Sequence, residues 1–326
     1  MTKRRIAQAI NDAYSEEMAR DPKVILFGED VEVSLFGDTR GLAERFSGQV
    51  RNTPISEAAI SGMAIGAALS GYRPICHLMF GNFLYTAFDS IANQVAKMRL
   101  MTGGQAHLPV TYFAAYGAGS STAAQHSDTP YPLLMNLGSI QVAVPSSAAD
   151  AKGLMKSAIR GNRPTCFLMP RLRAGALGEV PDGDWLVPFG VANILRGGTD
   201  VTIIAIGACV QHAVKAAEQL GAMGIDAELI DPRTLVPLDV ATLVASANKT
   251  GRVIIVDEAR DRCSAATHIA AVLSDKAFDA LLAPVWRITT PDMPVPYAPA
   301  IERAMLPDAQ KIVDAAQAIM KKSQSH

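Results

Sequence analysis

One charged side chain stands in the run NTPISEAAISGMAIGAALSGY, residues 52–72, and it is the carboxylate of Glu57. Ser56 before it is typical of a helix N-cap, which places Glu57 in the first helical turn. A negative charge there offsets the helix dipole by about 0.3–1 kcal/mol, so a purely structural explanation is available. The alternative is that this lone carboxylate among apolar neighbours binds or transfers a proton.

Three further segments carry residues capable of chemistry. MFGNF, Met79–Phe83, ends a strand pattern with two aromatic rings and a methionine, which suit either a flat apolar platform for a heteroaromatic ring or plain core packing. The long Gly- and Ser-rich stretch 114–132 contains His126, and a histidine in such a loop is suited to proton transfer near neutral pH. FGED, residues 27–30, is by itself typical of a solvated turn.

Several common motifs are missing from the sequence. There is no GxGxxG after a strand, no GxxxxGK[ST] and no GxSxG. The chain therefore lacks the usual backbone cradle for a diphosphate, and something else must hold the phosphates of any phosphorylated cofactor. The four cysteines, at positions 76, 166, 209 and 263, are far apart and predict neither a zinc site nor disulfides, so we expect a reducing compartment.

The elements that must position these residues alternate along the chain. Continuous apolar runs bounded by helical patterns predict parallel strands buried on both faces, hence two tandem doubly wound, mostly parallel α/β sheets. We expect domains at 1–175 and 189–326, with a linker at 176–188 where Gly, Pro and mixed charge interrupt the pattern. The expected helices include residues 57–69, 83–99, 148–160, 212–223 and 308–321.

Composition limits the possible partners. The chain has 326 residues, of which 49% are hydrophobic, enough for two cores. Its formal net charge of −1 gives no basic surface for nucleic acid or for an anionic membrane. The uncharged stretch after Glu57 ends at Tyr72, short of the roughly 20 residues that cross a bilayer, so we expect a tightly packed, buried helix.

Long motifs resemble one known family over nearly the whole chain. The runs LFGEDV, NTPISEAAISGMAIGAALSGYRP, FDSIANQVAKMRLMTGGQ, AAQHS, GIDAELIDPRTLVPLD and PVPYAP resemble the β subunit of the thiamin-diphosphate-dependent decarboxylating component of 2-oxoacid dehydrogenase complexes. Pyruvate, branched-chain 2-oxoacid and acetoin dehydrogenases contain such a subunit. The resemblance implies a transketolase-like pyrimidine-binding domain, a transketolase C-terminal-like domain and a reaction on a 2-oxoacid or acetoin.

The resemblance also implies partners. The family assembles as an α2β2 heterotetramer in which the α subunit carries the Gly-Asp-Gly motif for Mg²⁺ and the diphosphate. In this chain Gly37-Asp38 continues to Thr39 and Gly183-Asp184 to Trp185, so that motif is absent. The acyl group is expected to pass to lipoamide on a partner acyltransferase. We expect a cytoplasmic enzyme that is active only with its α subunit.

The resemblance assigns roles to individual residues. Glu57 matches the glutamate that hydrogen-bonds the pyrimidine nitrogen of thiamin diphosphate and favours its imino tautomer. Met79 and Phe83 are expected to lie against the pyrimidine, and His126 to assist acyl transfer. Many relatives have an acidic residue at His77, a glutamine at Met79 and an arginine at Phe113.

A potassium site is a further implication of the resemblance. Some relatives bind potassium through main-chain carbonyls, which would be those of Val110, Ala158, Ile159 and Gly161. In this chain Gly161 and Arg163 replace more polar residues of that turn.

Two other functions stay open at this point. The same fold could form half of a split transketolase that transfers a ketol group, which a sugar-phosphate activity would reveal. The chain could instead be a non-catalytic α/β subunit that only shapes its partner, in which case Glu57 would be dispensable.

Overall fold

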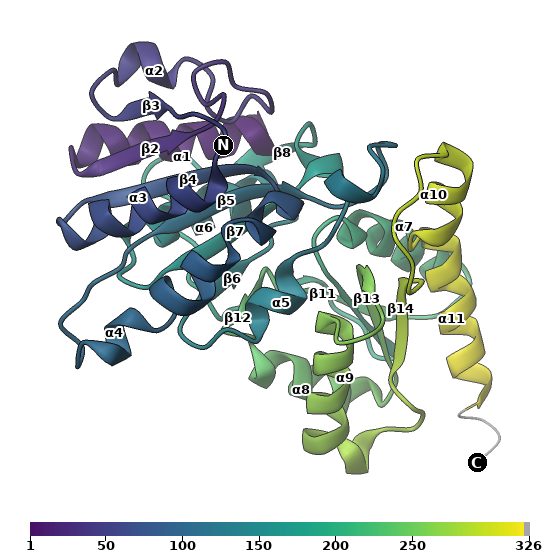
Figure 1. Cartoon of the computed structure of the whole chain (residues 1–326). Helices are drawn as coiled ribbons and strands as arrows, with labels where there is room; N and C mark the ends of the chain where they lie inside the picture. Colours follow the sequence, from purple (N-terminus) through teal and green to yellow (C-terminus); the bar gives the residue numbers. More distant parts are fainter. Residues whose placement is uncertain (323–326) are drawn as a thin grey trace. The chain divides into compact units, whose positions relative to one another are not determined.

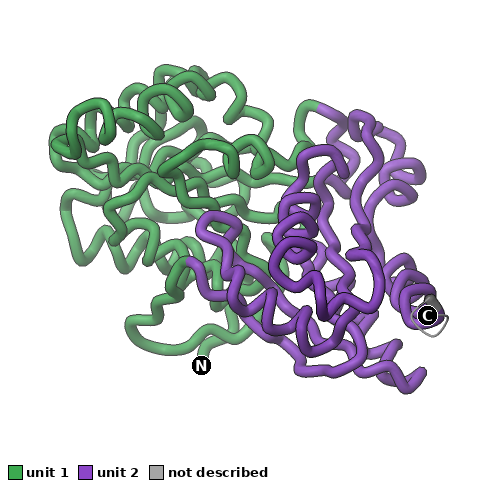
Figure 2. Tube along the Cα trace, turned by 90° about the horizontal axis from the view of Figure 1, so that it is seen from below, with its two compact units in different colours: residues 1–117, 125–189 green, residues 118–124, 190–326 purple. Residues whose placement is uncertain are grey.

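The computed structural model describes residues 1–322, which form two compact units (Figures 1 and 2). Unit 1 comprises residues 1–117 and 125–189, and unit 2 comprises residues 118–124 and 190–326. Each unit is a sheet between layers of helices, as the alternating pattern predicts, so the expected α/β class is confirmed. The linker expected at 176–188 contains strand β8, and its assignment as a linker stays a prediction.

Unit 1 is built on parallel strands in the order β6-β7-β5-β4-β2-β3. Gly28 of β2 pairs with Asn52 of β3 and with His77 of β4, so β2 and β3 end level with each other and β4 continues to Phe80. A separate antiparallel pair joins β1 to β8. The strands of the unit are β1 (Thr2–Arg5), β2 (Val24–Gly28), β3 (Val50–Asn52), β4 (Arg73–Phe80), β5 (Thr111–Tyr116), β6 (Gln141–Ala143), β7 (Thr165–Pro170) and β8 (Leu177–Val180).

Helices cover both faces of this sheet, because the strands present apolar side chains on both faces. Helix α1 (Ile6–Arg20) buries Ile6, Ile10 and Tyr14 in the same core as Leu154 of α6 (Ala148–Arg160). On the other face the Ser61 hydroxyl of α3 (Glu57–Leu69) lies 2.8 Å from the Tyr112 hydroxyl of β5. The shorter elements are α2 (Leu42–Arg45), η1 (Gly81–Tyr85), η2 (Ser90–Val95), α4 (Met98–Met101), η3 (Ala124–His126), α5 (Tyr131–Met135) and η4 (Arg171–Arg173).

Unit 2 has a five-stranded sheet in the order β14-β13-β10-β11-β9, with only β9 antiparallel to its neighbour. Helices α7 and α11 share a core with one face, and Ser246 of α8 hydrogen-bonds Thr202 on the other. Its elements are β9 (Asn193–Arg196), β10 (Val201–Ala205), α7 (Cys209–Ala222), β11 (Ala227–Asp231), β12 (Thr234–Val236), α8 (Val240–Thr250), β13 (Val253–Arg260), α9 (Ala265–Lys276), η5 (Phe278–Ala280), β14 (Trp286–Thr290), α10 (Pro299–Met305) and α11 (Ala309–Lys322).

Two expectations about helices are wrong. Residues 83–99 form no single α-helix but the 3₁₀ turn η1, the π-helical turn η2 and the start of α4. Helix α3 has the expected bounds, but it is not buried all round: Met63 is 53% and Leu69 51% exposed, because only one side of it packs on the sheet. None of the described helices is long and apolar enough to cross a membrane.

Candidate functional site

The carboxyl edge of the sheet in unit 1 collects the segments singled out from the sequence. Strands β2, β3, β4 and β5 run parallel, so the residues that follow them lie along one edge. Glu29 follows β2 directly, Glu57 begins the helix after β3, and Phe83 follows β4. We use the term carboxyl edge for these strand ends and their following loops, where open α/β sheets bind ligands.

Glu57 is the first residue of α3 and is partly exposed. Ser56 occupies the N-cap position as expected, but its side chain makes no capping hydrogen bond. No residue among 1–322 supplies a hydrogen bond or ion pair to the Glu57 carboxylate. Ile55 beside it is 80% exposed, so the start of α3 is open and this carboxylate is available to a ligand.

Glu29 is a site residue that sequence reasoning missed, and the expectation of a solvated turn at FGED is wrong for it. Its side chain is buried, at 6% exposure, and its Oε2 has no hydrogen-bond partner among the described residues. Burial raises the pKa of Glu29, and repulsion from the Glu57 and Asp30 carboxylates raises it further, against an opposing effect of His77. The available signal was its place directly after a buried strand, at the carboxyl edge.

His77 forms a buried polar pair behind this edge. Its Nε2 lies 3.0 Å from Oδ2 of Asp38, and its ring stacks on Phe113 with centroids 4.5 Å apart. The backbone N–H of Met79 points to Nδ1 at 3.4 Å. An Nδ1 that accepts leaves the imidazole proton on Nε2, so His77 donates to Asp38 and holds the end of β4.

Aromatic rings form a wall at the carboxyl edge, in the segment Met79–Phe83 for which the sequence suggested an apolar platform. Phe80 and Phe83 are partly buried, and the His126 ring meets both edge-on, with centroids 4.8 and 5.4 Å away. Met79 is 6% exposed with a φ of +56°, which turns the chain so that Phe80 presents its ring. The structure thus brings Phe83 and His126 together with Phe80, the other ring of the MFGNF segment, to which the resemblance gave no role.

The segment carrying His126 is anchored on both sides. The Asn82 amide donates to the Asp128 carboxylate, and the Asp128 backbone N–H donates to Oδ1 of Asn82, both at 3.1 Å. Within unit 2, the buried Glu302 carboxylate accepts from the backbone N–H groups of Gly119 and Ser121 at 2.7 and 2.8 Å. These contacts fix the Gly-rich loop that precedes the histidine.

The carbonyls expected to bind potassium already accept hydrogen bonds. Arg73 donates to the carbonyls of Ile159 and Gly161 at 2.9 and 2.7 Å, so a guanidinium lies against two of them. The Val110 carbonyl accepts from Thr165, and that of Ala158 from Gly161. A cation beside these oxygens disfavours a second one, so as arranged they do not fit a potassium ion.

Residues 1–322 contain no side-chain cluster for a metal ion. No group of three or more His, Cys, Asp or Glu side chains there could hold a metal ion. The carboxyl edge therefore offers two carboxylates, an imidazole and aromatic rings. Such an arrangement can exchange a proton with a ring nitrogen of a ligand and stack against the ligand's ring. The described side chains provide no metal ligands that could bind a phosphate group through a metal ion.

Comparison with protein families gives two matches. Residues 2–175 match the transketolase pyrimidine binding domain, and residues 190–312 match the transketolase C-terminal domain. Among curated proteins, the chain is 45% identical to the β subunit of acetoin:2,6-dichlorophenolindophenol oxidoreductase of Bacillus subtilis, covering 94% of each chain. It is 39% identical to the pyruvate dehydrogenase E1 component β subunit of the same organism, over 98% of this chain and 100% of that one.

Solved structures show the same fold. A split gene transketolase, described as an inactive β4 tetramer, superposes with a TM-score of 0.82 at 27% identity, over 98% of this chain and 99% of that one. A transketolase from Leishmania mexicana gives a TM-score of 0.73 at 16% identity, over 99% of this chain and 46% of that one. The second likeness concerns the fold alone.

Proposed function

The chain belongs to the family of transketolase-like β subunits found in acetoin and 2-oxoacid dehydrogenases, and we propose that its carboxyl edge binds the pyrimidine half of thiamin diphosphate. The observation that carries this proposal is the pair Glu57 and Glu29, one carboxylate without a partner in the described chain and the other buried with an orphaned oxygen. An aminopyrimidine offers a ring nitrogen and an amino group, the kind of partners such carboxylates need.

Each residue has a distinct task in this proposal. Glu57 shares a proton with the ring nitrogen, while Glu29, whose pKa is raised by burial and by the neighbouring carboxylates, accepts or donates a hydrogen bond next to it. Phe83 and the Met79 turn support one face of the ring, and Phe80 continues that wall. When bound, the cofactor supplies the electron sink that lets a bond to a carbonyl carbon break.

His126 is suited to the later acyl transfer rather than to holding the ring. It sits on the loop segment beyond the aromatic wall and is only partly buried. We propose that its imidazole donates or accepts a proton as the acyl group passes to lipoamide on a separate acyltransferase.

A partner subunit follows from what the described residues lack. With no metal-binding cluster and no diphosphate motif, we propose that an α subunit holds Mg²⁺ and the diphosphate in an α2β2 heterotetramer. The cysteines are all free, in accord with a reducing, cytoplasmic location. The substrate we propose is acetoin or a small 2-oxoacid, in line with the names of the two Bacillus subtilis relatives.

Calorimetry tests the split site. We expect tight Mg²⁺-dependent binding of thiamin diphosphate to the α–β pair and weak binding to this chain by itself; tight binding by the isolated chain would contradict the proposal. Screening the pair on acetoin, pyruvate and branched-chain 2-oxoacids with 2,6-dichlorophenolindophenol as electron acceptor then identifies the substrate.

A second function is supported by the structural likeness to the split gene transketolase. In that case the pair would transfer a ketol group between sugar phosphates and would reduce no dye with acetoin or 2-oxoacids. The same assay, run beside a sugar-phosphate assay, separates the two functions.

A further inference from the structure

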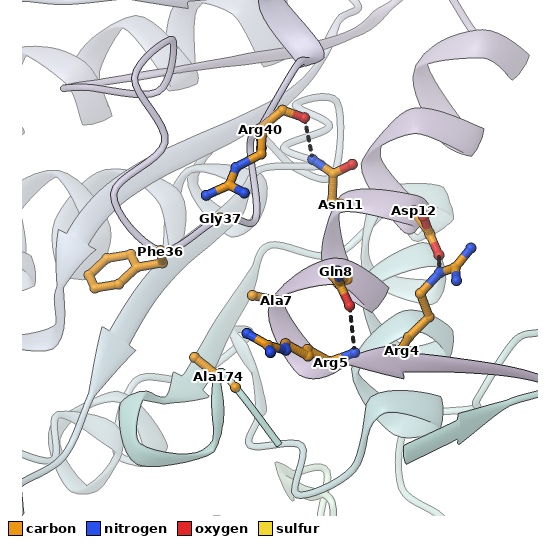
Figure 3. Close-up of a pocket in the computed structure, with 11 residues that line it drawn as sticks. Arg4, Arg5, Ala7, Gln8, Asn11, Asp12, Phe36, Gly37, Arg40 and Ala174 are labelled. Carbon is orange, nitrogen blue, oxygen red and sulfur yellow. Dashed lines mark hydrogen bonds and ion pairs between the residues drawn. The ribbon is translucent and has the colours of Figure 1, made fainter. Parts of the chain in front are cut away.

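A cationic cavity lies in unit 1 that the proposed reaction does not use. It measures about 390 Å³ and is formed by the start of α1, the loop that runs from Ser34 to Gly41, and the turn at Ala174 and Gly175. Figure 3 shows Arg4, Arg5 and Arg40 around it. The remaining side chains that line it are Ala7, Gln8, Asn11, Asp12, Phe36 and Ala174.

The charges in this cavity do not cancel. Asp12 is the sole carboxylate among the lining residues, and its Oδ2 already accepts from Nε of Arg4 at 2.6 Å. For Arg5 and Arg40, no ion pair or side-chain donation to an acceptor is found across the part of the chain that the structure describes. The lining residues therefore carry a net charge of +2: Arg4 is neutralised by Asp12, toward which its guanidinium is turned (Figure 3), and Arg5 and Arg40 remain.

Hydrogen bonds to the backbone fix the loop and the helix start that carry the two free arginines, Arg40 and Arg5. The Asn11 amide donates to the carbonyls of Asp38 and Arg40 at 2.9 and 3.0 Å, which ties the loop to α1. The first two helical N–H groups of α1 already donate to the carbonyls of Ala176 and Ala174. The cationic character therefore comes from side chains and not from a free helix end.

We propose that this cavity binds a small dianion of the phosphate or phosphate-monoester type. Guanidinium groups bind phosphate oxygens through paired, charge-assisted hydrogen bonds, and Arg5 and Arg40 are the groups left free to do so. A net charge of +2 matches a dianion, and a cavity of about 390 Å³ has room for a phosphate with a short organic tail. A singly charged carboxylate would leave one arginine uncompensated.

One loop contributes residues to the cavity and also contacts the carboxyl edge. Gly37 and Arg40 line the cavity, whereas the Asp38 carboxylate between them is buried and accepts from His77. Phe36 also lines the cavity, and its ring meets that of Phe80 with centroids 5.3 Å apart. The cavity therefore adjoins the aromatic wall, but none of the residues that line it is assigned to the pyrimidine in the proposed function, so the anion site is a different one.

Equilibrium binding to the assembled α–β pair tests the proposal. Thiamin diphosphate and Mg²⁺ are kept at saturation so that the probe cannot occupy the diphosphate position, and inorganic phosphate is titrated by calorimetry at constant ionic strength. We expect saturable binding of one phosphate per β chain, weakened about 10–100-fold in Arg5→Gln and in Arg40→Gln, the usual range for losing hydrogen bonds from a charged group.

The control is Arg262→Gln, which removes an exposed arginine of unit 2 that pairs with Asp292. This variant should bind phosphate as the unmodified pair does, and acetate should bind more weakly than phosphate. Absence of saturable binding, or equal binding by Arg40→Gln and the control, would overturn the proposal. Glycerol phosphate replaces inorganic phosphate in a second titration, and tighter binding of it would assign the site to a phosphate monoester.

Discussion

Two buried carboxylates in unit 1, those of Glu17 and Glu29, differ in the charges and hydrogen-bond donors around them. Glu17 of α1 is fully buried and accepts from Arg160 of α6 at 2.7 to 3.0 Å and from Arg20 at 2.8 Å. Glu29, at the carboxyl edge, is nearly as buried but has an oxygen with no partner among residues 1–322, and like charges face it. The first carboxylate holds two helices together, whereas the second is left without a partner for one oxygen, at a cost in stability.

The same contrast extends to the rest of the site. His77 is buried and bonded to Asp38, while His126 is partly exposed against two phenylalanine rings. Glu302 has three donors, the third being the Ser121 hydroxyl, and Glu57 has none in the described chain. Glu17, His77 and Glu302 are satisfied within the chain, whereas Glu57 is left for a ligand.

The largest expected effect concerns His126. His126→Ala should lower turnover with a lipoyl acceptor by roughly 10²–10⁴-fold, since a general acid–base group is lost, and should leave cofactor affinity intact. His107→Ala, at an exposed histidine, is the matched control. Steady-state rates and calorimetry on the pair measure both quantities, and unchanged turnover in His126→Ala would remove this residue from the mechanism.

A change at Glu17 tests the structural side of the comparison. Glu17→Gln leaves Arg160 with Asp184 as its remaining partner, so we expect a loss of about 3 kcal/mol in the free energy of unfolding, the low end for a broken buried pair. Urea denaturation measures it, with the exposed Glu218→Gln as control. A loss no greater than that of the control would mean that the network contributes nothing.

Glu302 should give a smaller effect. Glu302→Gln keeps one acceptor oxygen but turns an NH₂ group toward a backbone N–H, so we expect a loss of about 1–3 kcal/mol and faster proteolysis within residues 118–124. Limited proteolysis and urea denaturation check this. Protection equal to that of the unmodified protein would show that the loop is held by other contacts.

The smallest expected effect is a gain in stability when Glu29 is replaced by glutamine. Because its pKa is raised in the folded chain, the folded state binds more protons, so stability falls as pH rises from the ordinary glutamate pKa through the raised value. Glu29→Gln removes this loss. The melting temperature of Glu29→Gln should exceed that of the unmodified protein at pH 8 and match it at pH 4. A melting temperature that depends more strongly on pH in the variant would contradict a raised pKa for Glu29.

Much of this could be predicted from the sequence where a single signal dominates. The helices at 57–69 and 148–160 have the predicted bounds, and Ser56 and Glu57 lie at the predicted N-cap position and in the first turn. The broken helix at 83–99 could not, because tertiary packing overrides a helical pattern there. Contacts between distant segments, which no local pattern contains, determine three other features. These are the burial of Glu29, the burial of Met79 and the meeting of Arg5 and Arg40 at one cavity.

The central claim is that Glu57 transfers a proton and does not merely offset a helix dipole. Deuterium exchange at C2 of thiamin diphosphate, followed by NMR in the assembled α–β pair, reads this step directly in Glu57→Gln. We expect the pair to assemble and bind cofactor while the exchange rate falls roughly 10²–10⁴-fold. A rate equal to that of the unmodified protein, with a stability change under about 1 kcal/mol, would reduce Glu57 to a helix-terminal charge.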